Sequence, residues 1–363
     1  MRITIDLSVL ELPATGVAKV VSGLYGAIAE RFPDILLHGI HRRQLASTLP
    51  AGVKDEWIGR YLTPGLWRRL AVPIAAHRPG NDVIHFPWNG GVPKLRPGVR
   101  VVTTLHDVLP LTISGYFASG KAKEHYRRQR QSDIDRSTLV VTDSEFSKQE
   151  IMRHLRVRRE PVVIPCATSI ADFAETGVPA GKKYFLYVGG LDPRKSVDSL
   201  LRVFYALTAG GALTSTLVVT GSRRHAPPAL LSLLDEGLHR GCVELAGYVD
   251  DRALARLYAG ALALVYPSQY EGFGMPPLEA MTIGCPVITS RMTSIPEVCG
   301  DAALYVDPWS DQGLAEALQR VEQNADLRQR LSTRGRIRAA AFSWGRAADA
   351  FVQALRDCSA DIM

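Results

Sequence analysis

Two glutamates, Glu271 and Glu279, frame the segment YEGFGMPPLEAMTIG at residues 270–284. The glycines between them allow a ligand to approach the backbone closely, and the pair Pro276 and Pro277 is typical of a helix start. With Glu279 in the first turn of that helix, both carboxylates can point into one pocket about as wide as a nucleotide sugar. A second interpretation stays open, in which Glu279 only complements the helix dipole and Glu271 is solvated.

A second candidate binding segment is GGLDPRKS, which follows the apolar run YFLYV. Gly189 and Gly190 permit a tight turn, and Arg194 and Lys195 are expected to begin the next helix. Free N–H groups and the positive end of a helix dipole favour phosphate, and two neighbouring cations neutralise a diphosphate. The alternative is a surface turn with two solvated bases.

The elements that carry these loops alternate between strand and helix in both halves of the chain. This alternation predicts two α/β domains, each a parallel sheet wrapped by helices, and such sheets bind ligands beyond the carboxyl ends of their strands. Residues 166–183 show little periodicity and are expected to link the two. The predicted strands are 2–7, 35–40, 82–86, 100–105 and 138–143 in the first domain, and 184–189, 215–221, 242–247, 261–267 and 286–290 in the second.

His106 and Asp107 follow the predicted strand at 100–105, so we expect them at the carboxyl edge of the first sheet. A core histidine that hydrogen-bonds to the backbone is the alternative for His106. The triplet Asp133-Ile134-Asp135 lies in a basic, helix-like stretch, where residues two apart point away from each other. No metal site is therefore predicted there.

Composition indicates an ordinary globular protein with two cores. The chain has 363 residues, of which 46% are hydrophobic and 22% charged. No apolar run approaches the roughly 18 residues of a spanning helix, and the first residues alternate as in a strand, so we expect a cytoplasmic protein. The five cysteines are scattered without zinc or disulfide spacing, and reduced, mostly buried thiols are expected.

The net charge of +7 is concentrated in the first half, where residues 1–170 hold 24 Lys and Arg against 15 Asp and Glu. The basic runs at 121–130 and 153–159 lack the interleaved aromatic residues that nucleic acids stack on, so no nucleic acid partner is expected. Solvated helix faces, or attraction to an anionic membrane or a phosphorylated acceptor, remain open. The stretch Trp67 to Leu70, with two arginines between apolar residues, is expected to make an interfacial contact.

Together these segments resemble one family. Residues 270–284 resemble the motif of two glutamates separated by seven residues in retaining glycosyltransferases of GT-B architecture, of the large family four. Further segments extend the resemblance: GGLDPRKS is similar to the diphosphate-binding loop, 247–261 to the stretch flanking the nucleotide base, 104–111 and 142–151 to first-domain segments, and 344–355 to the terminal helix.

The resemblance implies two Rossmann-like, doubly wound domains facing across a cleft. Residues 1–170 would form an acceptor-side domain and residues 171–343 a nucleotide-sugar-binding domain, with residues 344–363 as a helix crossing back to the first.

Residue roles also follow from the resemblance. Glu279 would bind the donor ribose, Arg194 and Lys195 the diphosphate, and Glu271 the donor sugar. His106 and Asp107 would face the sugar, and one of them would assist the acceptor hydroxyl. The remaining donor-binding positions would be Gly16, Gly189, Gly190, Val249, Gly272, Phe273, Gly274 and Met275.

The expected reaction is retaining transfer of a hexose, mannose or a related sugar, from a GDP-sugar. The acceptor would be a saccharide or a polyprenyl-diphosphate-linked chain in synthesis of lipopolysaccharide O-antigen, capsule or exopolysaccharide, at the cytoplasmic face of the inner membrane. No metal or other cofactor is expected, because cations and a helix end can stabilise the leaving diphosphate. The alternatives are a UDP-sugar donor, a sugar-nucleotide epimerase and a non-catalytic sugar-nucleotide-binding module.

Overall fold

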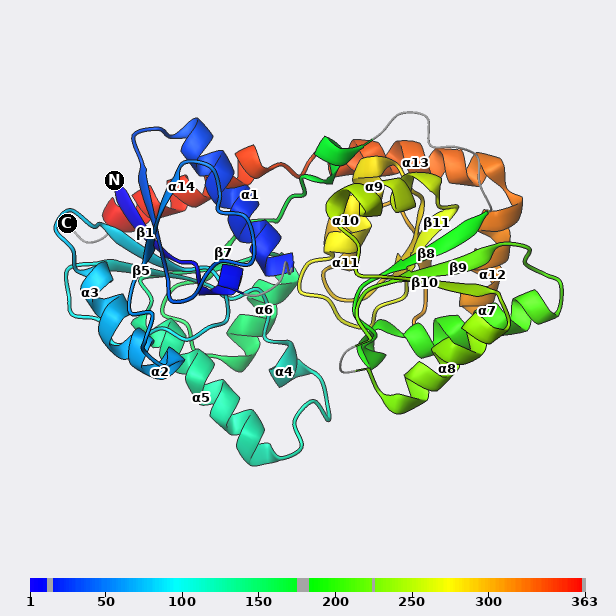
Figure 1. The fold of residues 1–363 in the computed structure, drawn as a ribbon, viewed down its shortest axis with the longest axis horizontal. Helices are drawn as coiled ribbons and strands as arrows, with labels where there is room; N and C mark the ends of the chain where they lie inside the picture. Colours follow the sequence, from blue (N-terminus) through cyan, green and yellow to red (C-terminus); the bar gives the residue numbers. More distant parts are fainter. Residues whose placement is uncertain (12–15, 175–182, 224–225, 361–363) are drawn as a thin grey trace. The chain divides into compact units, whose positions relative to one another are not determined.

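The computed structural model describes residues 1–11, 16–174, 183–223 and 226–360, which divide into two compact units (Figure 1). The first unit comprises Met1–Ala167 together with the segment that starts at Phe342, and the second comprises Thr168–Ala341. Each unit is built on one parallel sheet, and the α/β fold class predicted from the alternating pattern is confirmed.

The first sheet has the strand order β3-β2-β1-β4-β5-β6-β7. Adjacent residues of one strand belong to different hydrophobic clusters, as Val83 and Ile84 of β4 do. The sheet is therefore buried on both faces, and its inner strands are continuous apolar runs. The chain order reverses between β1 and β4, which is where such sheets form a binding crevice. The strands are β1 (Arg2–Asp6), β2 (Leu36–His41), β3 (Val53–Trp57), β4 (Val83–Phe86), β5 (Arg100–Thr104), β6 (Leu139–Thr142) and β7 (Val162–Val163).

Helices from both ends of the chain cover the first sheet. The last helix, α14, packs on α1: Phe351 meets Tyr25 edge to face with ring centroids 6.4 Å apart, and both rings are buried. Gly23 is needed at this contact, because a Cβ there would lie 2.1 Å from Cε2 of Trp344. The helices are η1 (Ser8–Glu11), α1 (Gly16–Arg31), α2 (Pro64–Leu66), η2 (Trp67–Ala71), α3 (Val72–Ala76), α4 (Leu109–Thr112), α5 (Gly120–Arg136), α6 (Glu145–His154) and α14 (Trp344–Ala360).

The second sheet has the order β10-β9-β8-β11-β12-β13, with the reversal between β8 and β11. Its strands are β8 (Tyr184–Val188), β9 (Thr216–Thr220), β10 (Val243–Gly247), β11 (Ala263–Tyr266), β12 (Val287–Ser290) and β13 (Leu304–Val306). Its helices are η3 (Ile170–Phe173), η4 (Pro193–Lys195), α7 (Val197–Ala209), α8 (Pro228–His239), α9 (Asp251–Gly260), α10 (Met275–Ile283), α11 (Ile295–Cys299), α12 (Asp311–Gln323) and α13 (Ala325–Ala339).

The predicted interfacial contact of Trp67 is wrong. This side chain is only 2% exposed, and its Nε1 donates to the carbonyl oxygen of Ile58 at 2.9 Å. The helix turns the indole inward against Val72 and Phe86, where burial of a large aromatic side chain is most favourable. Leu70, three residues further on, is 52% exposed.

All five cysteines are free thiols and four of them are buried, as expected from the sequence. In the described ranges no helix is both long enough and apolar enough to cross a membrane.

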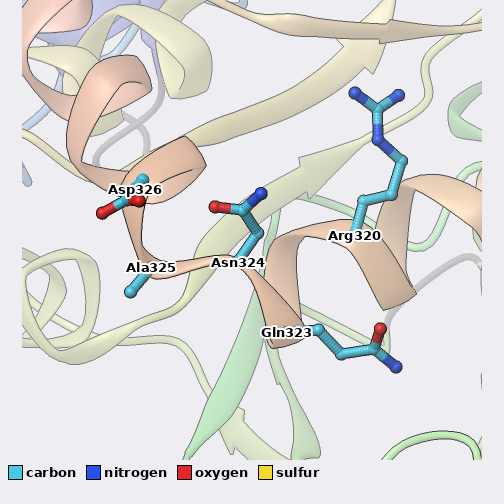
Figure 2. A pocket seen from close by; sticks show the side chains of 5 residues that line it. All are labelled: Arg320, Gln323, Asn324, Ala325 and Asp326. Carbon is cyan, nitrogen blue, oxygen red and sulfur yellow. The ribbon is translucent and has the colours of Figure 1, made fainter.

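A hollow of about 420 Å³ lies where α12 passes into α13 (Figure 2). It is lined by Arg320, Gln323, Asn324, Ala325 and Asp326. Because α12 begins beyond the carboxyl end of β13 and runs back, this hollow is at the amino edge of the sheet. Ligands of doubly wound sheets bind at the opposite edge, so we do not assign this hollow to the substrate.

Candidate active site

The second unit brings its candidate residues together at the carboxyl ends of β8 and β11, beside the reversal of strand order. Gly189 follows β8 with φ +138°, and a Cβ on it would lie 2.9 Å from Nζ of Lys195. Gly221 follows β9, and a Cβ there would lie 2.0 Å from the carbonyl oxygen of Gly189. Gly221 is needed for this close approach of the two loops, and Gly189 for its positive φ. The carbonyl of Gly190 accepts a hydrogen bond from the Tyr187 hydroxyl at 2.8 Å.

The sequence predicted that Arg194 and Lys195 begin the next helix, and this prediction is wrong. They form the short 3₁₀ turn η4, and α7 begins only at Val197, after Ser196 in a left-handed conformation with φ 52°. The side chain of Asp192 caps this turn by accepting from the Arg194 amide at 3.1 Å. The turn is an additional element that aims both cations toward the loop after β11.

Glu271 is the centre of this cluster. Its Oε1 accepts from the hydroxyls of Tyr266 at 2.7 Å and Ser268 at 2.8 Å, and it lies 3.5 Å from Nη1 of Arg194 and 3.7 Å from Nζ of Lys195. Burial alone would raise the pKa of Glu271, but the two cations and the two hydroxyl donors lower that pKa below its ordinary value. The site therefore holds an ionised carboxylate against two cations.

Tyr266 connects these charges. Its hydroxyl donates to Glu271 and accepts from Nζ of Lys195 at 2.8 Å, and the ammonium also lies 4.9 Å from the centre of its ring. Tyr266 is the last residue of β11 and is buried. It is therefore a positioning residue for the cluster, one that an apolar strand pattern does not reveal.

The glycine loop after Glu271 is held by the segment that follows β12. The Glu271 amide donates to Oγ1 of Thr293 at 3.0 Å, and the Ser294 hydroxyl donates to the carbonyl oxygens of Glu271 at 2.8 Å and Phe273 at 2.7 Å. Gly274, with φ +123°, precedes the first residue of α10. These bonds fix the backbone that was expected to grip a sugar, namely Gly272, Phe273, Gly274 and Met275.

Glu279 lies in the second turn of α10, so its predicted place in the first turn is wrong. A helix dipole acts mainly within the first turn, which removes the interpretation of Glu279 as a dipole partner. The side chain is 4% exposed, and Oε2 accepts from the hydroxyl of Tyr258 in α9 at 3.1 Å. Tyr258 lies in the segment that was expected to flank a nucleotide base, and Val249 lies half-buried in the preceding loop between β10 and α9.

In the first unit, residues that follow three neighbouring strands meet around His106. Nδ1 lies 2.7 Å from Oδ2 of Asp143, which follows β6, and Nε2 lies 3.0 Å from the carbonyl oxygen of Pro87, which follows β4. The His106 amide donates to Oδ1 of Asn89 at 3.1 Å. Oδ1 of Asp107 accepts from the amide of Leu109, the first residue of α4, at 3.0 Å.

Both ring nitrogens of His106 face oxygens that accept hydrogen bonds, an arrangement that suits the imidazolium. Burial lowers the pKa of His106, but Asp143, the Pro87 carbonyl and Asp107 raise it, to about 9. His106 is therefore a fixed cation near neutral pH and not a proton acceptor. The alternative in which His106 hydrogen-bonds to the backbone is correct for Nε2, which faces the Pro87 carbonyl, but not for Nδ1.

This cation should make folding depend on pH. Because the folded pKa of about 9 exceeds the ordinary 6.5, the stabilisation is complete below about pH 6.5 and is lost as the pH rises through 9. A shift of that size corresponds to about 3 kcal/mol. Thermal unfolding measured between about pH 6 and 9.5 should show a decline in the wild type that is absent from His106→Gln. Parallel curves for the two proteins would contradict the assignment.

Two further predicted features are located as follows. Gly16 begins α1 and is exposed, whereas the preceding residues 12–15 lie outside the described residues. Asp133 is buried and accepts from the Val92 amide at 2.7 Å, whereas Asp135 is exposed. Across the described parts of the chain, no group of three or more His, Cys, Asp or Glu residues is arranged to hold a metal.

Known proteins are similar to this chain in sequence, and others are similar to it in architecture. Residues 169–338 match the family described as Glycosyl transferases group 1, and residues 16–171 match Glycosyltransferase Family 4. O-antigen chain mannosyltransferase B of Escherichia coli is 33% identical over 256 residues, covering 68% of this chain and 67% of that protein. O-antigen chain mannosyltransferase RfbU of Salmonella typhimurium is 30% identical over 261 residues, covering 72% and 70%. Sucrose-phosphate synthase of Thermosynechococcus elongatus has a similar structure, with a TM-score of 0.77 at 19% identity over 99% of both chains.

Two doubly wound parallel sheets and the similarity to this solved structure define a GT-B fold. The chain belongs to the family of group 1 glycosyltransferases. The resemblance found from its motifs is thereby confirmed.

Proposed function

We propose that this glycosyltransferase transfers mannose or a related hexose from a GDP-sugar, with retention of configuration, to a lipid-linked saccharide in the synthesis of a surface polysaccharide. The observation that carries the chemistry is the cluster of Glu271, Arg194 and Lys195 at adjacent strand ends. Similarity to two O-antigen mannosyltransferases supports the sugar and the pathway.

The proposed chemistry follows the charges that develop in the reaction. Cleavage of the bond between the anomeric carbon and the phosphate oxygen places negative charge on the leaving diphosphate and positive character on the sugar. Arg194 and Lys195 stabilise the first, and one such donor contributes about 3 kcal/mol to the transition state. The Glu271 carboxylate holds the two cations and steadies the reacting face of the sugar. The leaving phosphate oxygen takes the proton of the acceptor hydroxyl, which then attacks from the same face.

First-unit residues contribute to turnover in this proposal. His106, as a cation, supplies positive charge, and Asp107 fixes the loop that carries it through its hydrogen bond to the Leu109 amide. The donor-binding positions of the second unit hold the nucleotide and sugar without a metal ion, because the cations already neutralise the diphosphate.

A donor screen tests this proposal. Purified protein is incubated with a synthetic saccharide acceptor and, in turn, GDP-mannose, GDP-fucose, UDP-glucose and UDP-N-acetylglucosamine, and products are detected by mass. A hexose added from GDP-mannose, with the anomeric configuration retained by NMR, is the expected outcome. Transfer only from a UDP-sugar would show that the donor is a UDP-sugar and not a GDP-sugar. Conversion of the free nucleotide sugar into an epimer would show that the protein is an epimerase.

Glu279 should determine nucleotide affinity. Glu279→Ala removes a charge-assisted hydrogen bond to the ribose, so GDP binding measured by calorimetry should weaken by about 1.5 to 3 kcal/mol. Glu316→Ala, which changes an exposed glutamate of α12, is the matched control and should leave affinity unchanged. Equal GDP affinities for Glu279→Ala and wild type would remove Glu279 from the ribose site.

A further inference from the structure

The first unit contains a large hollow of about 1080 Å³, which has no role in the reaction proposed above. Its walls come from the helix that starts at α2, the loop after β4, and α5. A volume near the upper end of typical ligand pockets could hold a diphosphate and a sugar. Its charged lining residues are Arg68, Arg69, Lys94, Arg130, Arg136 and Asp133.

The charge of this hollow is strongly positive. Asp133 is paired with Arg130 at 3.0 Å, and it also accepts from the Val92 amide. Among the described residues the other four cations form no close ion pair with a carboxylate, although burial raises the pKa of Asp133 and Arg68 and Arg136, at longer range, act to lower it. Unpaired cations that converge on one hollow favour an anion that carries more than one charge.

The loop after β4 is shaped to bring the cations close to its backbone. The guanidinium of Arg68 lies 5.0 Å from the centre of the Trp88 ring. Gly91 has φ +89°, and a Cβ on it would lie 3.3 Å from Nη1 of Arg68. Gly90 packs directly under the indole, because a Cβ there would lie 2.3 Å from that ring. A backbone wall without side chains, next to guanidinium groups, is typical of phosphate sites.

The helix that supplies Arg68 and Arg69 also exposes an apolar ridge. Leu66, Leu70 and Ile74 are 44%, 52% and 70% exposed, and their spacing of four residues places them along one side of the helix. The basic hollow and the exposed ridge therefore share one element. An anionic group joined to a lipid would complement both features.

The hollow is also connected to the candidate residues of the first unit. Asn89 lines it, and Nδ2 of Asn89 donates to the carbonyl oxygen of Asp107 at 3.1 Å. The His106 amide donates to Oδ1 of the same side chain, and Arg130 donates to the Asn89 carbonyl. A ligand in the hollow would thus lie beside the loop that carries His106 and Asp107.

We propose that this basic hollow binds the diphosphate of a lipid-linked saccharide acceptor, with Leu66, Leu70 and Ile74 contacting the lipid. The inference rests on the proposed transferase function and adds the site that selects the acceptor. Arg69, Lys94 and Arg136 are exposed cations of the site, and Arg136 also donates to the carbonyl oxygen of Val92.

The test uses farnesyl diphosphate as the probe, measured by calorimetry in the presence of saturating GDP. Arg69→Ala combined with Lys94→Ala should weaken binding about tenfold or more, because each change removes a charged hydrogen bond. Lys121→Ala combined with Lys123→Ala removes two exposed cations of α5 that lie outside the hollow, and it should leave binding unchanged. Leu70→Ser combined with Ile74→Ser should weaken binding of farnesyl diphosphate but not of inorganic diphosphate.

Unchanged binding in the Arg69 and Lys94 variant would overturn the proposal. So would loss of binding to phosphatidylglycerol vesicles in that variant while farnesyl diphosphate binding stays intact, because the hollow would then serve membrane headgroups. The proposed function can fail separately: if no sugar is transferred in the donor screen but the variant loses the probe, the diphosphate site stands without the transferase. If the Arg69 and Lys94 variant transfers sugar at the wild-type rate, the proposed acceptor site is wrong but the proposed transferase function stands.

Discussion

Glu271→Gln should lower turnover about a hundredfold or more while the protein still binds GDP. Glutamine can keep the hydrogen bonds from Tyr266 and Ser268 but carries no charge to hold Arg194 and Lys195. The two cations then repel each other and lose their alignment. Affinity for free GDP should not fall, because both cations become fully available to its diphosphate.

Turnover and GDP affinity are therefore measured together, with Glu244→Gln, at an exposed position of β10, as the matched control. The control should match the wild type in both quantities. If Glu271→Gln lost GDP affinity and turnover in equal proportion, Glu271 would be a nucleotide ligand and not part of the reacting site.

Lys195→Ala should reduce turnover by about a hundredfold, since the ammonium acts on charge that grows as the diphosphate leaves. Arg194→Ala should reduce it at least as much, because Nη1 also donates to the Tyr270 carbonyl at 2.7 Å and holds the start of the Glu271 loop. The assay is steady-state transfer at saturating donor.

Lys183→Ala is the control, because Lys183 is an exposed lysine just before β8 and should be dispensable. Thermal unfolding verifies that each variant is folded. Wild-type turnover in a folded Lys195→Ala protein would mean that Arg194 and backbone amides alone stabilise the leaving group.

The sequence predicted the interior strands of both sheets and one edge strand, β10, but missed the other three edge strands. β3, β7 and β13 were missed, and each stands at the end of its sheet. Interior strands are covered on both faces and must be apolar throughout, whereas β3 has the sequence VKDEW with exposed polar residues. β7 and β13 are only two and three residues long, too short to show a pattern.

The sequence predicted the charged residues of the site but not the buried tyrosine hydroxyls that bind them. Glu271, Arg194 and Lys195 do meet, as expected from loops that follow adjacent strands. Tyr266 and Tyr258 carry hydrogen bonds to the two glutamates, but in the sequence they belong to apolar patterns that equally indicate core packing.

One missed partner did leave a signal. Asp143 is the last residue of the predicted strand at 138–143, His106 directly follows the predicted strand at 100–105, and residues at the ends of neighbouring parallel strands gather at one edge of the sheet. The displacement of Arg194 and Lys195 into a separate 3₁₀ turn had no comparable signal, because Ser196 is not a residue that usually adopts a left-handed conformation.

The measurement that tests the central claim most directly is release of GDP from GDP-mannose, followed with and without a lipid-linked saccharide acceptor in buffer containing EDTA. We predict that wild-type protein releases GDP only when the acceptor is present, that chelation leaves the rate unchanged, and that Glu271→Gln slows release about a hundredfold. Acceptor-independent release, or activity that is abolished by EDTA and restored by manganese, would contradict the account.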